Sequence, residues 1–410
     1  YLASFLPAEL APQVIALGLN GTLVSGSGFV QMGATSGENA LPFADLEDYE
    51  LSADFEEFSL APVAGAPGFT NLSGSMRVTK ESGRLELDSS NASLVYPTVF
   101  ESPVALTRLS GTLIWRSNVR GVSLLSDSIL VQTPVVTMDS SLELLLPKDG
   151  SSPVIDVESV WAVTDISQVE DVLPTAVMSP KLVDWLDNAL ETGEVVDGEF
   201  QLSGALADFP FRNGEGVFRA RGLARNVTMR FARQWPAISE LDAIVELDGL
   251  SLSTDTNTGV SGGIAFENAV ARFDELGRSD LIVETAGKSG ASALYRYVGN
   301  SPIRGLFGDQ FVSLQVDGDI DYDVSLGIPL RAIPEFTLDA RLTALGGSFG
   351  LSYLPHQLTD LRGDIRIDRS GVYGEQVQAD FLGEPVTLGI QPTPEDERYS
   401  LRVSANGSLT

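Results

Sequence analysis

Polar and apolar residues alternate without a break through residues 312–328. Every even position is apolar, aromatic or glycine, and every odd position is polar or glycine. Because neighbouring side chains of a strand point to opposite faces, this pattern predicts a long strand with one apolar and one polar face. A sheet made of such strands has to cover its apolar face with some partner. The polar face is anionic, since four of its residues are aspartates: Asp317, Asp319, Asp321 and Asp323.

A ten-residue pattern occurs four times and indicates that one structural unit is reused. Each copy reads apolar, Ser or Thr, any, Leu, any, Gly or Ala, any, apolar, any, apolar. From the leucine onward the period is two, so each copy is predicted to enter a strand, with a bend at the small residue on its apolar face. The distances between copies differ, which argues against a solenoid of fixed period. The copies are residues 69–78, 106–115, 238–247 and 358–367.

The same alternation and the frequent turn signals predict a mostly β, antiparallel chain with short connections. Shorter strands are expected at Arg84–Leu87, Ser93–Tyr96 and Ile129–Gln132. No low-complexity linker divides the chain. We therefore expect two continuous β segments, residues 1–171 and 172–410, with a joint near Leu173–Ser179.

Three short helices are expected, as plugs or caps rather than as a layer. The clearest spans Pro180–Glu191, where Ser179 suits the N-cap and Gly193 is placed to end the helix. Apolar residues at helical spacing also predict helices at Ala291–Val298 and, less clearly, at Glu9–Leu17.

Composition narrows the possible partners. The chain has 410 residues, is 43% hydrophobic and carries a formal net charge of -30. Such acidity argues against nucleic acid, because nucleic-acid binding depends on Lys and Arg that neutralise phosphates. The sequence contains no cysteine and no apolar run long enough to span a membrane as a helix. Because it begins at Tyr1, we expect it to be a segment of a longer protein.

Catalytic motifs are not evident. The single histidine, His356, follows a proline in a predicted loop and is expected to be solvated. Asp319, Asp321 and Asp323 have the spacing of a calcium loop, but Val324 occupies the position of the loop's glycine. A solvent-facing strand is the better interpretation. No pair of carboxylates stands out as a glycosidase site, so the sequence predicts neither an enzyme nor a cofactor or metal site.

Two arrangements of the apolar faces remain open. In the first, pairs of sheets face each other as β-sandwiches, which pattern alone slightly favours. In the second, one long, curved sheet leaves its concave apolar face uncovered by protein. Such a face would exceed the apolar patches that soluble monomers normally expose and would need an apolar guest, such as acyl chains. The sandwich arrangement would instead suit a passive scaffold, an adhesin or a carbohydrate-active protein.

A resemblance to a known family changes this balance. The matching stretches are Leu72–Gly74, Tyr96–Phe100, Leu109–Trp115, Val172–Pro174, Trp185–Leu190, Gly204–Phe211, Gly216–Arg219, Trp235–Ala243, Asn300–Ile303 and Ile328–Leu330. In this order and spacing they resemble the YhdP family of AsmA-like periplasmic proteins over nearly the whole chain. One departure is Val172, where the family often has tyrosine.

The resemblance implies an all-β fold with few short helices: an elongated, highly curved antiparallel sheet that forms a repeating β-groove with an open hydrophobic trough. It also implies a role in lipid transport, as part of a bridge that is anchored in the inner membrane and carries phospholipid through the periplasm towards the outer membrane. The acyl chains would contact the apolar faces of the strands. The expected groove residues are Leu72, Met76, Val78, Leu113, Trp115, Val312, Leu314, Val316, Ile320, Tyr322, Val324, Leu326, Ile365 and Ile367.

Overall fold

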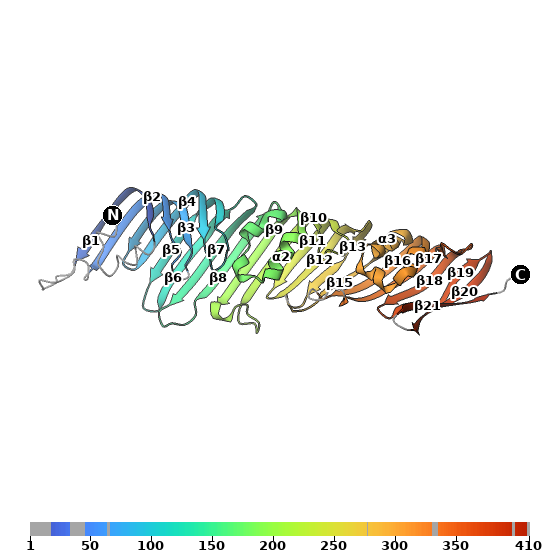
Figure 1. Ribbon diagram of the computed structural model, residues 1–410. Helices are drawn as coiled ribbons and strands as arrows, with labels where there is room; N and C mark the ends of the chain where they lie inside the picture. Colours follow the sequence, from blue (N-terminus) through green and yellow to red (C-terminus); the bar gives the residue numbers. More distant parts are fainter. Residues whose placement is uncertain are drawn as a thin grey trace. The chain divides into compact units, whose positions relative to one another are not determined.

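The computed structural model describes residues 18–32, 46–63, 66–276, 278–329, 335–395 and 398–407. The chain forms two compact units. Figure 1 labels their helices and strands. The first contains Tyr1–Asp187 and Glu194–Gly222, and the second contains Asn188–Gly193 and Leu223–Thr410. The dividing line crosses two strands rather than a linker. The division expected at residue 171 stays a prediction.

The first unit is a meander in which every strand pairs antiparallel with the next. Its strands are β1 (Asn20–Met32), β2 (Leu46–Leu60), β3 (Gly68–Thr79), β4 (Ser82–Val95), β5 (Val104–Ser117), β6 (Gly121–Gln132), β7 (Val136–Pro147) and β8 (Val154–Val163). β9 (Leu190–Ala205) and β10 (Val217–Met229) contribute residues to both units. Short helices connect these strands: η2 (Ile166–Val172), η3 (Thr175–Val177), α2 (Pro180–Ala189) and η4 (Leu206–Asp208).

The second unit is also antiparallel, but β12 pairs with both β13 and β14, which follow one another along it. Its strands are β11 (Ile238–Asp248), β12 (Ser251–Ser261), β13 (Ile264–Glu267), β14 (Val270–Phe273), β15 (Leu281–Gly290), β16 (Leu314–Ile328), β17 (Thr337–Leu351), β18 (Leu358–Asp368), β19 (Gly371–Phe381), β20 (Glu384–Glu395) and β21 (Arg398–Gly407). Its helices are α3 (Ala291–Gly299), η5 (Pro302–Leu306) and η6 (Gly308–Ser313).

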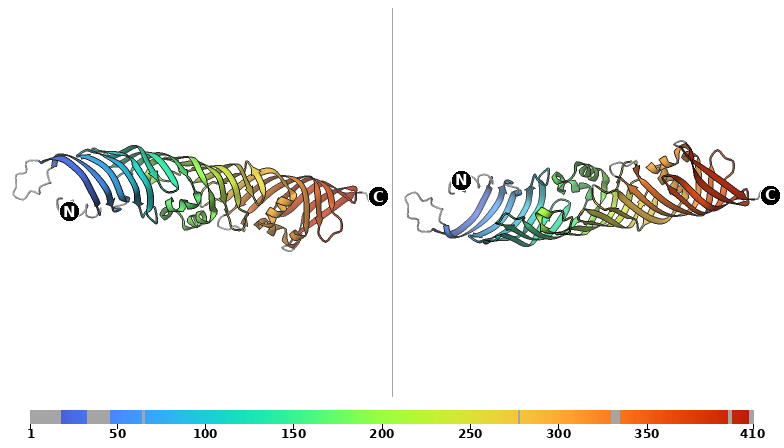
Figure 2. Two further views of the ribbon diagram at one scale, coloured as in Figure 1. Left: turned by 90° about the horizontal axis from the view of Figure 1, so that it is seen from above. Right: turned by 90° about the horizontal axis from the view of Figure 1, so that it is seen from below.

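The all-β, antiparallel fold predicted from the sequence is confirmed. The described strands form one sheet that is not closed into a barrel, and no second sheet faces it within these residues. The strands of each unit are visibly bent (Figure 2). β4 joins the expected strands Arg84–Leu87 and Ser93–Tyr96 into one element, and β6 contains Ile129–Gln132. The β-sandwich alternative is therefore wrong for the described part of the chain.

Polar residues in the left-handed conformation bend the strands in mid-course. Asn71 in β3 has a φ of 59°, and each adjacent strand also contains a left-handed residue: Glu57 in β2, with a φ of 51°, and Asn91 in β4, with a φ of 55°. The strand register shifts at these positions, as expected of β-bulges. Asparagine tolerates this conformation better than most residues. The Asn71 side-chain amide also donates to the carbonyl oxygens of Ser90 and Asn91, at 3.1 and 3.0 Å.

These bulges correct one detail of the repeat. We expected the bend at its small residue, but in three copies the left-handed residue lies three positions earlier: Asn71, Glu240 and Asp360. The glycine itself has a positive φ in the second and fourth copies, at Gly111 and Gly363. Gly74 serves another purpose, because a Cβ there would overlap the carbonyl oxygen of Glu86 on the adjacent strand.

Replacing Asn71 by valine is expected to destabilise the first unit by about 2–3 kcal/mol. Valine adopts the left-handed conformation at a steric cost and cannot donate the two hydrogen bonds. Asn71→Gly keeps the conformation and should lose only about 1 kcal/mol. Urea unfolding of the three proteins measures these differences. Equal midpoints for the valine and glycine variants would contradict the bulge assignment.

The two α-helices of the described residues, α2 and α3, agree largely with expectation. α2 begins at Pro180 as predicted, and the Leu182 amide donates to the Ser179 Oγ at 3.3 Å. The helix ends at Ala189 rather than Glu191, because the chain passes directly into β9; Gly193 therefore lies inside a strand and does not terminate the helix. α3 matches the expected Ala291–Val298 helix. The helix expected at Glu9–Leu17 lies outside the described residues.

Candidate functional site

Apolar side chains align from strand to strand on one face of the first unit. The strand register places Val78 opposite Leu51 and Gly83, and Trp115 opposite Gly83 and Leu124. The row continues through neighbouring strands, and a second row runs beside it. We call these residues the first open strip, because all are half-buried or exposed although they lie inside a sheet. They are Leu51, Met76, Val78, Leu85, Leu113, Trp115, Leu124, Leu144 and Ile155.

The other ends of the same strands are covered by the chain itself. Leu72, Val104 and Leu109 are each no more than 6% exposed. Phe100 and Val172 pack against this cluster, Val172 from η2. The Ala176 amide of η3 donates to the Val99 carbonyl oxygen at 3.1 Å and ties the connection to the β4–β5 loop. The apolar face of the first unit is therefore divided into a covered part and an open part.

The second unit shows the same division along a single strand. In β16, Leu314, Val316 and Ile320 are half-buried, and their partners on β17 include Leu351 and Phe349. These residues form the second open strip: Leu314, Val316, Ile320, Phe349 and Leu351. Leu342 and Ile365 lie instead in the row of Tyr322, and Ile365 packs against a buried cluster of β19 and β20.

Further along β16, a cover fills the apolar face. Tyr322, Leu326 and Ile328 are 6%, 7% and 0% exposed. Val298 of α3 and Trp235 of the β10–β11 loop belong to the cluster that surrounds Leu326 and Ile328. α3 therefore packs on the apolar, concave face of its own unit (Figure 2). Hydrocarbon has no direct access to this part of the floor while the cover is in place.

The structure thus sorts the fourteen expected groove residues. It brings Met76, Val78, Leu113 and Trp115 together in the first open strip, and Leu314, Val316 and Ile320 in the second. Leu72, Tyr322 and Leu326 are buried by the chain, and Val324, Ile365 and Ile367 pack against covered clusters. Whether any of these residues contacts lipid stays a prediction.

One expected groove residue, Val312, does not lie on the strand that the sequence predicted for it. The strand begins two residues later, at Leu314. Val312 lies in η6, where its side chain is 64% exposed. The alternation continues into η6 by coincidence, because Phe311 is the residue that packs inward, with its ring stacked on Tyr295 at 4.5 Å.

Several members of the open strips were not expected from the sequence. Leu124, Leu144 and Ile155 belong to the first open strip, in β6, β7 and β8. Phe349 belongs to the second, in β17. A signal was present, because Leu144 and Ile155 lie in period-two runs of the same kind as residues 312–328.

The open strips carry no ionisable side chain. Among the expected groove residues only Tyr322 titrates, and burial raises its pKa because the phenolate is poorly solvated there. Burial likewise raises the pKa of Tyr297 in the cover. Both tyrosines therefore stay neutral at physiological pH, so the inner face offers contact without charge.

The opposite face of the sheet is polar and hydrated. Its ion pairs are exposed, for example Arg108 with Asp88 at 3.0 Å and Lys288 with Asp321 at 3.3 Å. Such pairs contribute little to stability. The aspartates of β16 lie on this face, as the alternation predicted. No group of residues in the described part of the chain is arranged to hold a metal ion.

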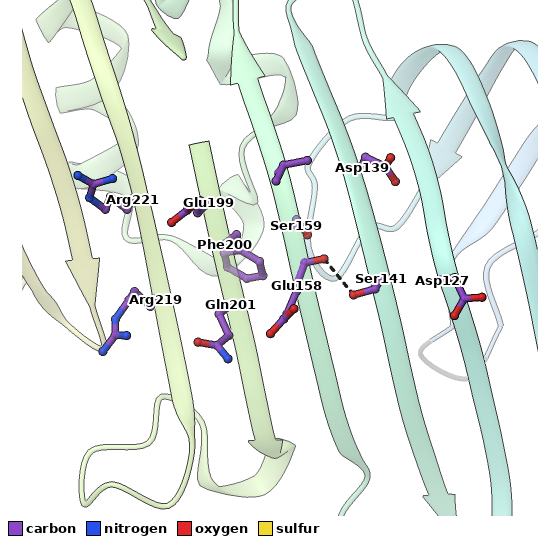
Figure 3. A pocket seen from close by; sticks show the side chains of 11 residues that line it. Asp127, Asp139, Ser141, Glu158, Ser159, Glu199, Phe200, Gln201, Arg219 and Arg221 are labelled. Carbon is purple, nitrogen blue, oxygen red and sulfur yellow. Dashed lines mark hydrogen bonds between the residues drawn. The ribbon is translucent and has the colours of Figure 1, made fainter. Parts of the chain in front are cut away.

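A shallow depression lies on this polar face of the first unit (Figure 3). Arg219 and Arg221 of β10 line one side, and acidic residues of β6 to β9 line the rest. These side chains point away from the apolar strip, since they occupy the alternate positions of the same strands. The acidic residues are Asp127, Asp139, Glu158 and Glu199.

His356 lies in the β17–β18 loop, exposed, with its ring 6.2 Å from that of Phe381. None of the helices in the described ranges is both long and apolar enough to cross a bilayer. The candidate site is the pair of apolar open strips.

Comparisons with known proteins agree with this geometry. The family described as YhdP protein matches residues 2–410. The intermembrane phospholipid transporter YhdP of Escherichia coli K12 is 26% identical over 371 residues, which cover 90% of this chain and 29% of that protein. The chain thus spans less than a third of the length of this relative. No solved structure matches significantly. Since the family match extends over almost every residue, the chain belongs to the YhdP family.

Proposed function

We propose that this chain is a segment of an intermembrane phospholipid-transport bridge, and that acyl chains travel along its open strips. One observation carries the proposal: neighbouring strands align apolar side chains in rows that the protein leaves half-exposed. The relative's printed name, intermembrane phospholipid transporter, supports the choice of cargo. We further propose that the chain works in the periplasm, between the inner and outer membranes.

Such a strip lowers the free energy of moving an acyl chain through water. Each methylene group removed from water contributes about 0.8 kcal/mol, so a chain of about 16 carbons in water costs on the order of 10 kcal/mol. A continuous aliphatic floor removes much of this cost at every point along the path. Aliphatic contacts are non-directional, so successive positions differ little in free energy and the lipid is not trapped.

Headgroups need no dedicated pocket in this arrangement. The strips lie on the uncovered part of the apolar face. The phosphate group of a phospholipid can therefore stay in water while the acyl chains of the same lipid contact the strip. Transport along the strip requires no bond to be made or broken. We therefore propose a non-catalytic role, without cofactor or metal.

Lipid extraction of the purified chain tests the proposal. The chain, isolated from a Gram-negative host without detergent, is expected to carry co-purified phospholipid that organic solvent releases and mass spectrometry identifies. A delipidated sample should regain phospholipid from vesicles. An empty chain that takes up none would favour the alternative, a passive β scaffold of the cell envelope.

A further inference from the structure

Large aromatic side chains on the apolar face lie opposite glycines of the neighbouring strand. The register pairs Trp115 with Gly83 and Trp161 with Gly198 in the first unit. It pairs Phe266 with Gly259 and Tyr322 with Gly287 in the second. Four such direct pairs join four different pairs of strands.

In each pair the ring occupies the space above the glycine. A Cβ built on Gly83 would lie 2.5 Å from the Trp115 Cη2 and would overlap other atoms of the same ring. A Cβ on Gly198 would lie 2.5 Å from both the Cε2 and the backbone carbonyl oxygen of Trp161. One on Gly222, in the next strand, would lie 2.6 Å from the Val195 Cγ1 and 3.2 Å from the Trp161 Cη2. Thus the rings rest against the backbone of the adjacent strands.

Burial of the glycines shows the same arrangement. Gly83, Gly198 and Gly222 are buried although their own strands face an open strip or its margin. Trp115 lies over Gly83 and Trp161 over Gly198, whereas Val195 and Trp161 together lie over Gly222. Both tryptophans are themselves half-buried. One flat face of each indole therefore covers backbone, and part of the ring remains accessible.

We propose that Gly83 and Gly198 are positioning residues that keep Trp115 and Trp161 flat, so that no large side chain rises into the path of the acyl chains. This inference rests on the proposed function. Strand side chains normally stand roughly perpendicular to the sheet. An upright indole would project beyond the surrounding leucines and interrupt the floor; a glycine on the next strand removes the side chain that would hold it upright.

The test is Gly83→Ala in the purified chain. The added methyl group forces the Trp115 ring to move by roughly 1–2 Å to regain ordinary contact of about 3.5–4 Å. Exchange of a fluorescent phospholipid between the loaded chain and vesicles of phosphatidylethanolamine and phosphatidylglycerol is expected to slow about ten-fold. A raised ring would keep roughly two methylene groups of a passing acyl chain away from the apolar surface, and this lost contact raises the barrier to exchange. The amount of bound phospholipid should change less than two-fold.

Two further variants assign the effect to the ring. Gly83→Ala combined with Trp115→Leu should exchange phospholipid several-fold faster than Gly83→Ala alone, because no ring remains to be raised. Gly26→Ala, in β1, is the matched control: its Cβ meets the nearest atom at an ordinary 3.5 Å, so exchange should not change. If Gly83→Ala does not fold, as circular dichroism would show, the double variant decides. A folded Gly83→Ala/Trp115→Leu protein supports the clash with the ring, and an unfolded one overturns the positioning role.

The outcomes separate this inference from the proposed function. A wild-type chain that takes up no phospholipid overturns both. A lipid-loaded wild type with unchanged exchange in Gly83→Ala overturns the positioning role alone. Slow exchange that persists in the double variant also overturns the positioning role, because the ring would then not be the obstacle.

Discussion

Aspartates at both Val316 and Ile320 are expected to abolish phospholipid uptake while leaving the chain folded. Both side chains are half-buried on the second open strip. There the new carboxylates can stay hydrated, so they avoid the cost of several kcal/mol that burial of an unpaired charge would impose. Acyl chains, however, would have to cross two charged positions on the floor. Uptake of phospholipid from vesicles and circular dichroism measure the two effects.

Gln315→Asp is the matched control for Val316→Asp. The two residues are adjacent in β16, but Gln315 lies on the polar face, so the same charge should leave uptake unchanged. Normal uptake by a folded Val316→Asp/Ile320→Asp variant would show that lipid does not use this strip. Global unfolding of the variant would show that protein, not an open path, covers these residues.

Trp235→Ala is expected to destabilise the second unit by about 3–5 kcal/mol, the range found for large-to-small substitutions in protein cores. Trp235 is 1% exposed, and the centroid of its ring lies 5.8 Å from those of Phe231 and Phe336. Its removal would leave a cavity beneath the cover of β16. Urea unfolding, followed by circular dichroism, measures the loss.

Trp115→Ala provides the comparison, because it makes the same chemical change on an open strip. Trp115 is half-buried, and we expect a loss of only about 1–2 kcal/mol. Similar losses for both variants would contradict the distinction between open and covered parts of the apolar face.

The alternation of residue types predicted the faces of the strands well. In β16 the burial of side chains follows the sequence pattern, with apolar residues inward and aspartates outward. This success has a simple physical basis: a period of two fixes which residues share a face, whatever the partner of that face.

The pattern could not show which parts of the face are covered. Val316 and Leu326 have equivalent positions in the alternation, yet one is half-buried and the other is 7% exposed. The difference is made by Trp235 and α3, which are distant in sequence, so tertiary packing decides it. The bulges were hidden for a related reason: a left-handed Asp360 or Glu240 reads as an ordinary polar strand residue.

Nearly every described strand pairs with its chain neighbour, and the exception, β14 with β12, spans only one short strand, so the hydrogen-bonded contacts stay close in sequence. Low contact order favours fast folding, because little loop entropy is lost before contacts form. Each hairpin can then add to the one before it as the chain emerges, without waiting for distant segments. The same property makes a hairpin a unit of growth: duplicating or deleting a pair of strands leaves the remaining register intact. The four copies of the ten-residue pattern, at irregular intervals, are what such growth by hairpin duplication would leave behind.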